Sequence, residues 1–195
     1  MFNYKERREK LYALMETEGV DLVFLPKHTA DLDYLTGTER RVVTFGNVQY
    51  THHWVAGAFL HPKHEPKFVF PRMIVEFDSP NGVDPNTTTV SELDDAHAKF
   101  KKVAESFGKV KKIAVSSRTW GETIMHIMQI FPDATIVNAE ELVNKLRRIK
   151  SAEEIAEMTK ACHLVDDVLA QVEGRVNIGV TELDLKTEVN FQMNE

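Results

Sequence analysis

The chain has 195 residues, of which 43% are hydrophobic and 28% are charged, and its formal net charge is −6. This composition is typical of a globular protein, and the scattered basic residues of an acidic chain do not favour nucleic-acid binding. The sequence has neither an apolar run long enough to cross a membrane nor an apolar N-terminal signal core, so we expect no membrane association. A lone cysteine, Cys162, excludes an internal disulfide and is typical of the cytoplasm, where we expect the protein to reside.

The first part of the chain predicts one helix and two short strands. Apolar residues at helical spacing predict a helix over Tyr4–Glu18, and Gly19 would end it because glycine adopts a left-handed backbone at low cost. The continuous apolar run Asp21–Pro26 is typical of a strand buried on both faces. Asp33–Gly37 is interpreted as a second short strand closed by a glycine turn.

The middle of the chain predicts a pair of strands. A long connection over residues 38–51 leads to a strand expected at Trp54–Leu60. His61–Pro66 has the composition of a hairpin-like loop, so Lys67–Pro71 is expected to pair back on the preceding strand. Residues 78–89 are rich in Pro, Asn, Asp, Gly and Thr, which predicts a surface loop.

Helices and strands alternate from residue 91 onward. Ser91, Thr119 and Asn138 each precede an apolar pattern and are expected to cap a helix, Thr119 with Glu122 at capping-box spacing. The expected elements are a helix over 91–107 ended by Gly108, a strand over Lys112–Ser116, a helix over Thr123–Phe131, a strand over Ala134–Val137 and a helix over Glu140–Arg148.

The alternation of strands and helices, with hairpin pairing in the middle, predicts a fold of the α/β class. We expect a three-layer domain with a mixed sheet over residues 1–150. The charge changes after this point, because residues 1–150 carry 21 Lys and Arg and 20 Asp and Glu, whereas residues 151–195 carry 3 and 10. Residues 151–195 are therefore expected to begin a second domain that is incomplete in this chain.

Two amphipathic helices are expected in residues 151–195. Ser151 and Glu154 have capping-box spacing before a long helix that Gly174 would end, and Thr181 begins another helix towards Glu195. The first helix carries an apolar stripe that needs a partner surface. Its members are Ile155, Met158, Ala161, Leu164, Val165, Val168, Leu169 and Val172.

Four sequence elements, in this order and spacing, resemble the pita-bread metallopeptidase family, which includes aminopeptidase P, prolidase and creatinase. The resemblance implies a creatinase-like N-terminal domain over 1–150 and the start of the catalytic domain over 151–195. The elements are Arg7-Arg8 with Leu11, Met15 and Gly19-Val-Asp21; Tyr34-Leu-Thr-Gly37; Leu146-Arg147 with Lys150-Ser151 and Glu154-Ile155; and Gly179 with Thr181-Glu182 and Asp184.

The resemblance also implies the cofactors and partners of a full-length parent protein. Such enzymes hold two divalent metal ions (Mn, Co or Zn) with two Asp, one His and two Glu, all downstream of the helices present here. They are dimers that act on small peptides or other small molecules, and the N-terminal domain can lend residues to the active site of the neighbouring subunit. We therefore expect a homodimer whose isolated chain is catalytically incomplete.

The residues themselves predict no catalytic or metal site. Asp166, Asp167 and Asp184 are better explained as a solvated acidic face, because adjacent carboxylates on a helix point in different directions. His52-His53 are expected on opposite sides of a strand. His61 and His64 could meet across a turn, but no further ligands complete a site.

Three residues in or after the long connection are candidates for substrate binding: Arg40, His53 and Trp54. An arginine could bind a substrate carboxylate and a tryptophan could close over an apolar ring. The alternative is that Arg40 is solvated and Trp54 belongs to the core.

Two functions are consistent with these observations. The first is the N-terminal portion of a metal-dependent Xaa-Pro peptidase-like hydrolase, which contributes to dimerisation and shapes the substrate site. The alternative is a stand-alone, non-enzymatic creatinase-like module that acts in binding or assembly.

Overall fold

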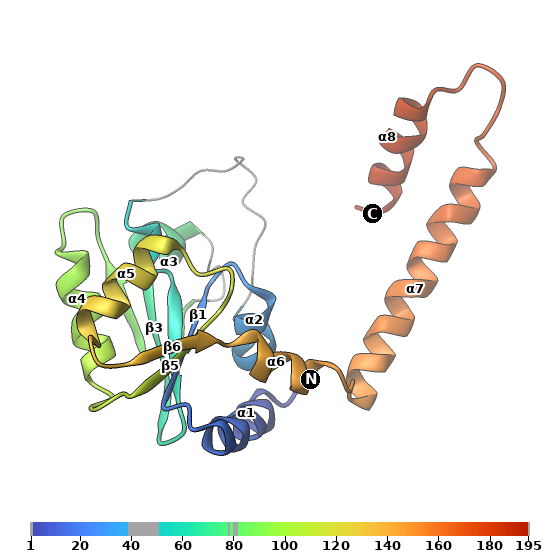
Figure 1. Cartoon of the computed structure of the whole chain (residues 1–195). Helices are drawn as coiled ribbons and strands as arrows, with labels where there is room; N and C mark the ends of the chain where they lie inside the picture. The colour runs from blue at the N-terminus through green and yellow to red at the C-terminus, as the bar shows by residue number, and fades with distance from the viewer. Residues whose placement is uncertain (1, 39–50, 78, 80–81, 195) are drawn as a thin grey trace. The chain divides into compact units, whose positions relative to one another are not determined.

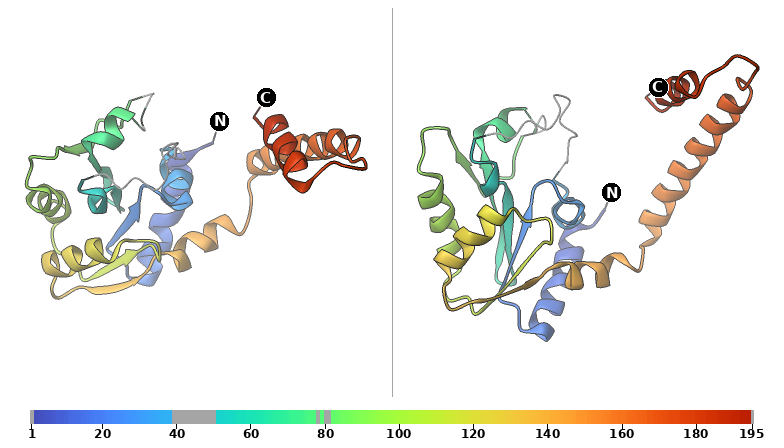
Figure 2. Two further views of the ribbon diagram at one scale, coloured as in Figure 1. Left: turned by 90° about the horizontal axis from the view of Figure 1, so that it is seen from above. Right: turned by 45° about the horizontal axis from the view of Figure 1, so that its top comes forward.

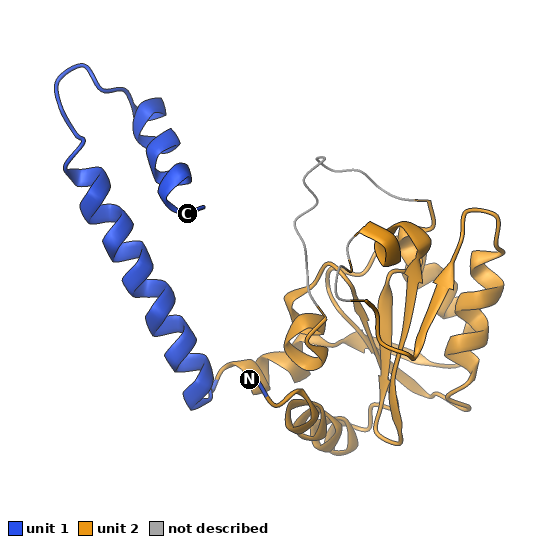
Figure 3. Cartoon of the chain, turned by 180° about the vertical axis from the view of Figure 1, so that it is seen from behind, with its two compact units in different colours: residues 1–2, 149–195 blue, residues 3–148 orange. Residues whose placement is uncertain are grey.

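The computed structural model describes residues 2–38, 51–77, 79 and 82–194. The chain forms two compact units, one of residues 3–148 and the other of residues 149–195 together with 1–2 (Figure 3). The described residues contain no helix that is long and apolar enough to cross a membrane. Each unit is considered separately below.

A mixed sheet lies at the centre of the larger unit. Among the described residues it has six strands in the order β4-β3-β2-β1-β5-β6. β1 pairs antiparallel with β2 and parallel with β5, and the other pairs are antiparallel for β2–β3 and parallel for β3–β4 and β5–β6. The strands are β1 Leu22–Pro26, β2 Gly57–His61, β3 His64–Pro71, β4 Thr87–Val90, β5 Lys112–Val115 and β6 Thr135–Asn138.

Helices cover both faces of this sheet, as Figures 1 and 2 show. Successive residues of β1 point to opposite faces, so Val23 and Leu25 pack on one side while Leu22 and Phe24 pack on the other. The first face is covered by α1 Tyr4–Glu18, α2 Ala30–Thr36, α3 Arg72–Phe77 and α6 Glu140–Arg147; the second by the 3-10 helix η1 His53–Val55, α4 Ala96–Glu105 and α5 Gly121–Ile130.

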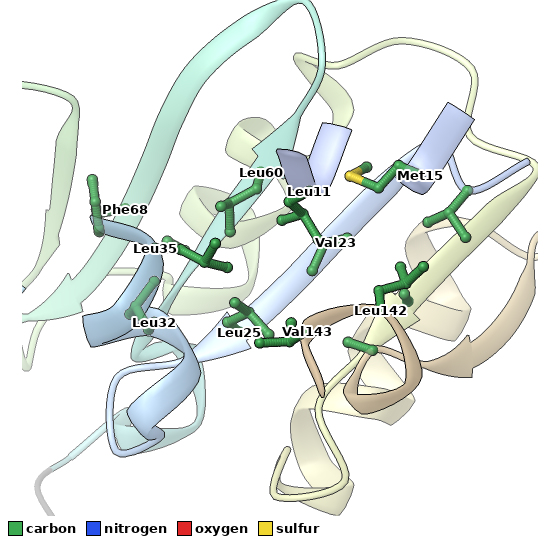
Figure 4. Close-up of a cluster of buried hydrophobic side chains, with 14 of the residues drawn as sticks. Leu11, Met15, Val23, Leu25, Leu32, Leu35, Leu60, Phe68, Leu142 and Val143 are labelled. Carbon is green, nitrogen blue, oxygen red and sulfur yellow. The ribbon is translucent and has the colours of Figure 1, made fainter. Parts of the chain in front are cut away.

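The core is therefore divided by the sheet into two apolar layers. In the layer drawn in Figure 4, leucines, a valine and a methionine from three helices meet the sheet. The labelled side chains are Leu11 and Met15 of α1, Leu32 and Leu35 of α2, Leu142 and Val143 of α6, and Val23, Leu25, Leu60 and Phe68 of the strands. The predicted three-layer α/β fold with a mixed sheet is confirmed.

The prediction of a strand at Asp33–Gly37 is wrong. Asp33–Thr36 form the second half of helix α2, and Gly37 is its C-cap. Leu32 and Leu35 lie on the same side of this helix and are fully buried, which is the spacing of a helical face rather than of a strand. Gly37 ends the helix in the left-handed conformation, with φ of 72°. Burial of this short helix against the sheet outweighs its local resemblance to a strand.

Three boundaries in the middle of the chain differ from prediction. The segment predicted as one strand from Trp54 begins as η1, and β2 starts only at Gly57. β3 begins at His64, inside the predicted hairpin loop, and the predicted surface loop ends in strand β4. Pairing with neighbouring strands extends both segments, which local composition does not reveal.

The predicted helix caps in residues 91–148 were also displaced. Asp95, not Ser91, caps α4, and its side chain accepts a hydrogen bond from Ala98 N. Trp120 is the N-cap of α5 and makes no side-chain capping bond, so the expected Thr119 capping box is absent there. Ala139 precedes α6, although Asn138 Oδ1 accepts a hydrogen bond from Glu140 N over 2.9 Å.

Gly57 allows β2 to pass close to β1. A Cβ at this position would lie 2.5 Å from Phe24 Cζ and 2.6 Å from the backbone oxygen of Leu25. We expect Gly57→Ala to lower the free energy of unfolding by about 1–3 kcal/mol, because the strands would have to separate. In urea denaturation, Gly121→Ala is the control, since a Cβ there meets no atom within 4 Å and should leave stability unchanged or slightly raised. Equal midpoints for the two variants would contradict this account.

The smaller unit is a pair of helices, α7 Ala152–Glu173 and α8 Glu182–Gln192. The predicted capping box of Ser151 with Glu154 is confirmed at the start of α7, and α8 begins at the predicted Thr181, which forms a second capping box with Asp184. Val168 and Val172 are the buried members of the α7 apolar stripe. The large exposed members are Ile155, Met158, Leu164, Val165 and Leu169.

Candidate functional site

The loops that carry histidine, tryptophan and charged residues lie at one edge of the sheet. β1 and β5 are parallel neighbours, but the chain leaves β1 into α2 on one face and leaves β5 into α5 on the other. In open α/β sheets such a divergence creates a crevice at the carboxyl ends of the strands, where ligands usually bind. The first part of the site is built from three segments at this edge: the residues after β1, the loop after β5, and η1, which precedes β2.

An aromatic cluster forms where these segments meet. We call His28, His53 and Trp120 the His–Trp cluster. The ring centroids of His53 and Trp120 are 4.9 Å apart in an edge-to-face arrangement, and those of His28 and Trp120 are 5.6 Å apart. His28 Nε2 lies 3.0 Å from the backbone oxygen of Arg118. Trp120 remains 38% exposed, so the cluster offers a partly open aromatic surface with two imidazoles.

Trp54 lies in the core beside this cluster. It is 6% exposed, its ring stacks on His126 with centroids 4.1 Å apart, and it also contacts Phe100. Its backbone oxygen accepts a hydrogen bond from Thr123 Oγ1 over 2.6 Å. Of the three predicted substrate-binding residues, only His53 is partly exposed at the site, while Arg40 lies outside the described residues. Their role in binding stays a prediction.

A second feature of this edge is a cavity of about 420 Å³, which we call the charged crevice. Its opposing charges come from Asp31 and Arg147, whose Oδ1 and Nη1 atoms are 2.7 Å apart, and from Arg118 and Glu140. Glu140 also accepts a hydrogen bond from Ser117 Oγ. The lining residues are Thr29, Ala30 and Asp31 from the start of α2, Arg118 from the loop after β5, and Glu140, Asn144 and Arg147 from α6.

Sequence reasoning missed most of this site. The sequence alone assigns no role to Asp31 or Trp120, and it identifies Arg147 only as part of a family motif. A positional signal was available, because the missed segments follow the predicted strands at Asp21–Pro26, Lys112–Ser116 and Ala134–Val137. Residues that follow parallel strands share one edge of a sheet.

No group of three or more His, Cys, Asp or Glu within the described parts of the chain could hold a metal ion. Hydrogen bonds from the side chain and backbone of Thr181 lower the pKa of Asp184, whose carboxylate is thus engaged as a helix cap. His61 and His64 do meet, with centroids 4.9 Å apart, but His61 Nδ1 accepts a hydrogen bond from Lys63 N. These donor sets do not fit a dinuclear site of Asp, His and Glu. The predictions of no metal and no catalytic residue stay predictions.

The prediction that His52 and His53 lie on a strand is wrong. His52 adopts the left-handed conformation, with φ of 62°, immediately before η1. The two rings are therefore separated by a turn of the backbone rather than by strand alternation.

Comparisons with known proteins identify a family and several relatives of this chain. Residues 7–149 match the family model of the creatinase/prolidase N-terminal domain. The chain is 34% identical over 91 residues to the uncharacterised peptidase YqhT of Bacillus subtilis, an alignment that covers 46% of this chain and 25% of that protein.

Solved structures share the fold of the chain. A prolidase from Thermococcus sibiricus superposes with a TM-score of 0.80 at 19% identity, over 100% of this chain and 50% of that protein. A Xaa-Pro dipeptidase from Bacillus anthracis gives a TM-score of 0.72 at 20% identity, over 98% and 49%. The chain thus spans about half the length of these proteins. It belongs to the creatinase/prolidase N-terminal domain family.

Proposed function

We propose that the chain is the N-terminal portion of a Xaa-Pro dipeptidase-like hydrolase of the cytoplasm. The observation that carries this proposal is the family match over residues 7–149 combined with fold similarity over about half of two proteins named for this activity. Under this proposal residues 1–150 are the N-terminal domain and residues 151–195 begin the catalytic domain.

The two divalent metal ions of such an enzyme (Mn²⁺, Co²⁺ or Zn²⁺) would be held by residues outside this chain. The acidic residues of α7 and α8 do not fit that role, since Asp184 is a helix cap and the described residues offer no third ligand near any His pair. The contribution of residues 1–195 would therefore be non-catalytic: a folded domain, a helix with an exposed apolar stripe, and a sheet edge that shapes the substrate site.

The His–Trp cluster supports a role in shaping the substrate site, by packing on a peptide bound in the neighbouring subunit of a homodimer. Trp120 presents an aromatic face suited to an apolar ring, and His53 orients that face through their edge-to-face contact. The cluster would bind and position substrate and exclude water, without taking part in the chemical step.

The test uses the complete reading frame from which the chain comes. If the proposal holds, residues after Glu195 include two Asp, one His and two Glu, and the full-length protein cleaves Xaa-Pro dipeptides only with divalent metal. The 195-residue chain should show no turnover with added Mn²⁺, Co²⁺ or Zn²⁺. A natural stop codon directly after Glu195, or turnover by the short chain, would contradict the proposal and, in the first case, favour a non-enzymatic module.

Variants of the full-length protein test the role of the cluster. Trp120→Ala should lower kcat/KM by about fivefold, as expected for the loss of one aromatic contact of roughly 1 kcal/mol. Leu93→Ala is the control, because Leu93 is 98% exposed and lies outside the cluster. Unchanged kinetics in Trp120→Ala would remove the cluster from the substrate site.

A further inference from the structure

We propose that the charged crevice is a binding site for a small zwitterion, that is, a free amino acid or short peptide with one carboxylate and one ammonium group. It lies at the divergence between β1 and β5, the position where open α/β sheets usually bind ligands. Its volume of about 420 Å³ falls within the range of small-molecule sites in proteins.

The lining supplies donors for a carboxylate. Arg147 uses Nη1 to reach Asp31, but a guanidinium has five N–H donors, so others are available to a ligand. Neither the guanidinium of Arg118 nor the side-chain amide of Asn144 makes a hydrogen bond or ion pair with any other described residue. Two arginines and an amide that converge on one cavity can bind a carboxylate through charge-assisted, bidentate hydrogen bonds.

The same cavity supplies acceptors for an ammonium group. Asp31 is buried and lines the cavity from the start of α2, and Glu140 lines it from the start of α6. The two carboxylates balance the two guanidinium groups, so the crevice has no net formal charge. A polyanion would meet uncompensated carboxylates there, whereas a zwitterion can place each charge against its opposite.

The site is held in shape before any ligand binds. Thr29, which is buried, donates a hydrogen bond from Oγ1 to Pro26 O over 2.8 Å and fixes the start of α2. The backbone of Arg118 is held on both sides of its Cα, because its N donates a hydrogen bond to Ser116 Oγ and its O lies 3.0 Å from His28 Nε2. A preformed cavity of this kind avoids much of the ordering cost of binding.

Binding to the charged crevice does not depend on peptidase activity, since all the lining residues belong to residues 3–148. The 195-residue chain is therefore the correct protein for the test, and its result is separable from that of the full-length activity assay. Failure of the binding proposal would not contradict the proposed peptidase function, and the reverse also holds.

The experiment is a titration of the ¹⁵N-labelled chain followed by NMR, with the dipeptide L-alanyl-L-proline as probe. Its two matched analogues are N-acetyl-L-alanyl-L-proline, which lacks the ammonium group, and L-alanyl-L-prolinamide, which lacks the carboxylate. We expect shifts at Asn144 and Arg118 with the dipeptide, and a Kd at least about tenfold weaker for each analogue, the effect of losing one hydrogen-bonded charge.

Inorganic phosphate is the anion control and should bind more weakly than the dipeptide. Tighter binding of phosphate, equal binding of all three peptides, or no shifts at the crevice with L-alanyl-L-proline would each overturn the proposal.

Variants locate the binding. Arg118→Gln and Asn144→Ala should each weaken binding of L-alanyl-L-proline several-fold while retaining a dispersed, folded spectrum, because both side chains are exposed. The control is Lys109→Gln, which removes an exposed cation that does not line the crevice and should leave the Kd unchanged. Dipeptide binding that survives both crevice variants, or that falls equally in the control, would place the ligand elsewhere.

Discussion

Replacing Phe100 by alanine is expected to lower the free energy of unfolding of the larger unit by about 3–5 kcal/mol. Phe100 is fully buried on α4, and its ring centroid lies 5.1 Å from that of Phe59, 5.2 Å from that of Trp54 and 5.6 Å from that of Phe24. These rings come from three separate elements. The substitution would therefore leave a cavity that the surrounding sheet and helices could fill only in part.

The measurement is urea denaturation followed by far-ultraviolet circular dichroism. Phe77→Ala is a matched control, because it removes the same atoms from a phenylalanine of α3 that is 60% exposed. We expect the control to change stability by less than about 1 kcal/mol. Comparable losses in the two variants would mean that the layer around Phe100 is not the principal core of this face.

The second large effect is expected in the association state. The exposed apolar residues of α7 form a contiguous helical stripe, and soluble monomers rarely leave so large an apolar surface open to water. We therefore predict that the 195-residue chain self-associates, most simply as a two-fold dimer. Val165→Glu combined with Leu169→Glu should make it monomeric, because two carboxylates would have to be buried in the interface.

Light scattering at high micromolar concentration tests this prediction. Ala156→Glu combined with Ala170→Glu is the control, since it adds the same charges at exposed α7 positions on the side of the helix opposite the stripe. A monomeric wild type would reject the prediction. Persistence of the dimer in the Val165→Glu, Leu169→Glu variant would show that another surface holds the chains together.

The elements that the sequence predicted correctly are those whose signals are local. The capping boxes at Ser151 and Thr181 bring the partners of each hydrogen bond within three residues of one another, so both helix starts could be identified directly. The run before Pro26 is buried at every position because β1 lies inside the sheet, and its continuous apolar character follows from that. Alternation of such segments was enough to indicate the three-layer fold.

The elements that were predicted incorrectly depend on contacts with distant parts of the chain. By composition, Asp33–Gly37 could form a strand or a helix. The packing of Leu32 and Leu35 on the sheet stabilises the helix. β4 has no apolar run of its own, and its identity as a strand comes from pairing with β3. Propensity is a weak preference that tertiary contacts can overrule.

The candidate site was almost entirely decided by tertiary structure. By itself, the sequence determined the elements with local caps and apolar runs, the fold class, and the change of character after residue 150. Only folding brings Asp31 to Arg147, 116 positions away, and Trp120 to His28 and His53. The physical reason is that charges and aromatic rings have no periodicity along the chain. The strand order β1–β5–β6 determines which of these side chains meet, because it places the ends of distant strands at one edge of the sheet.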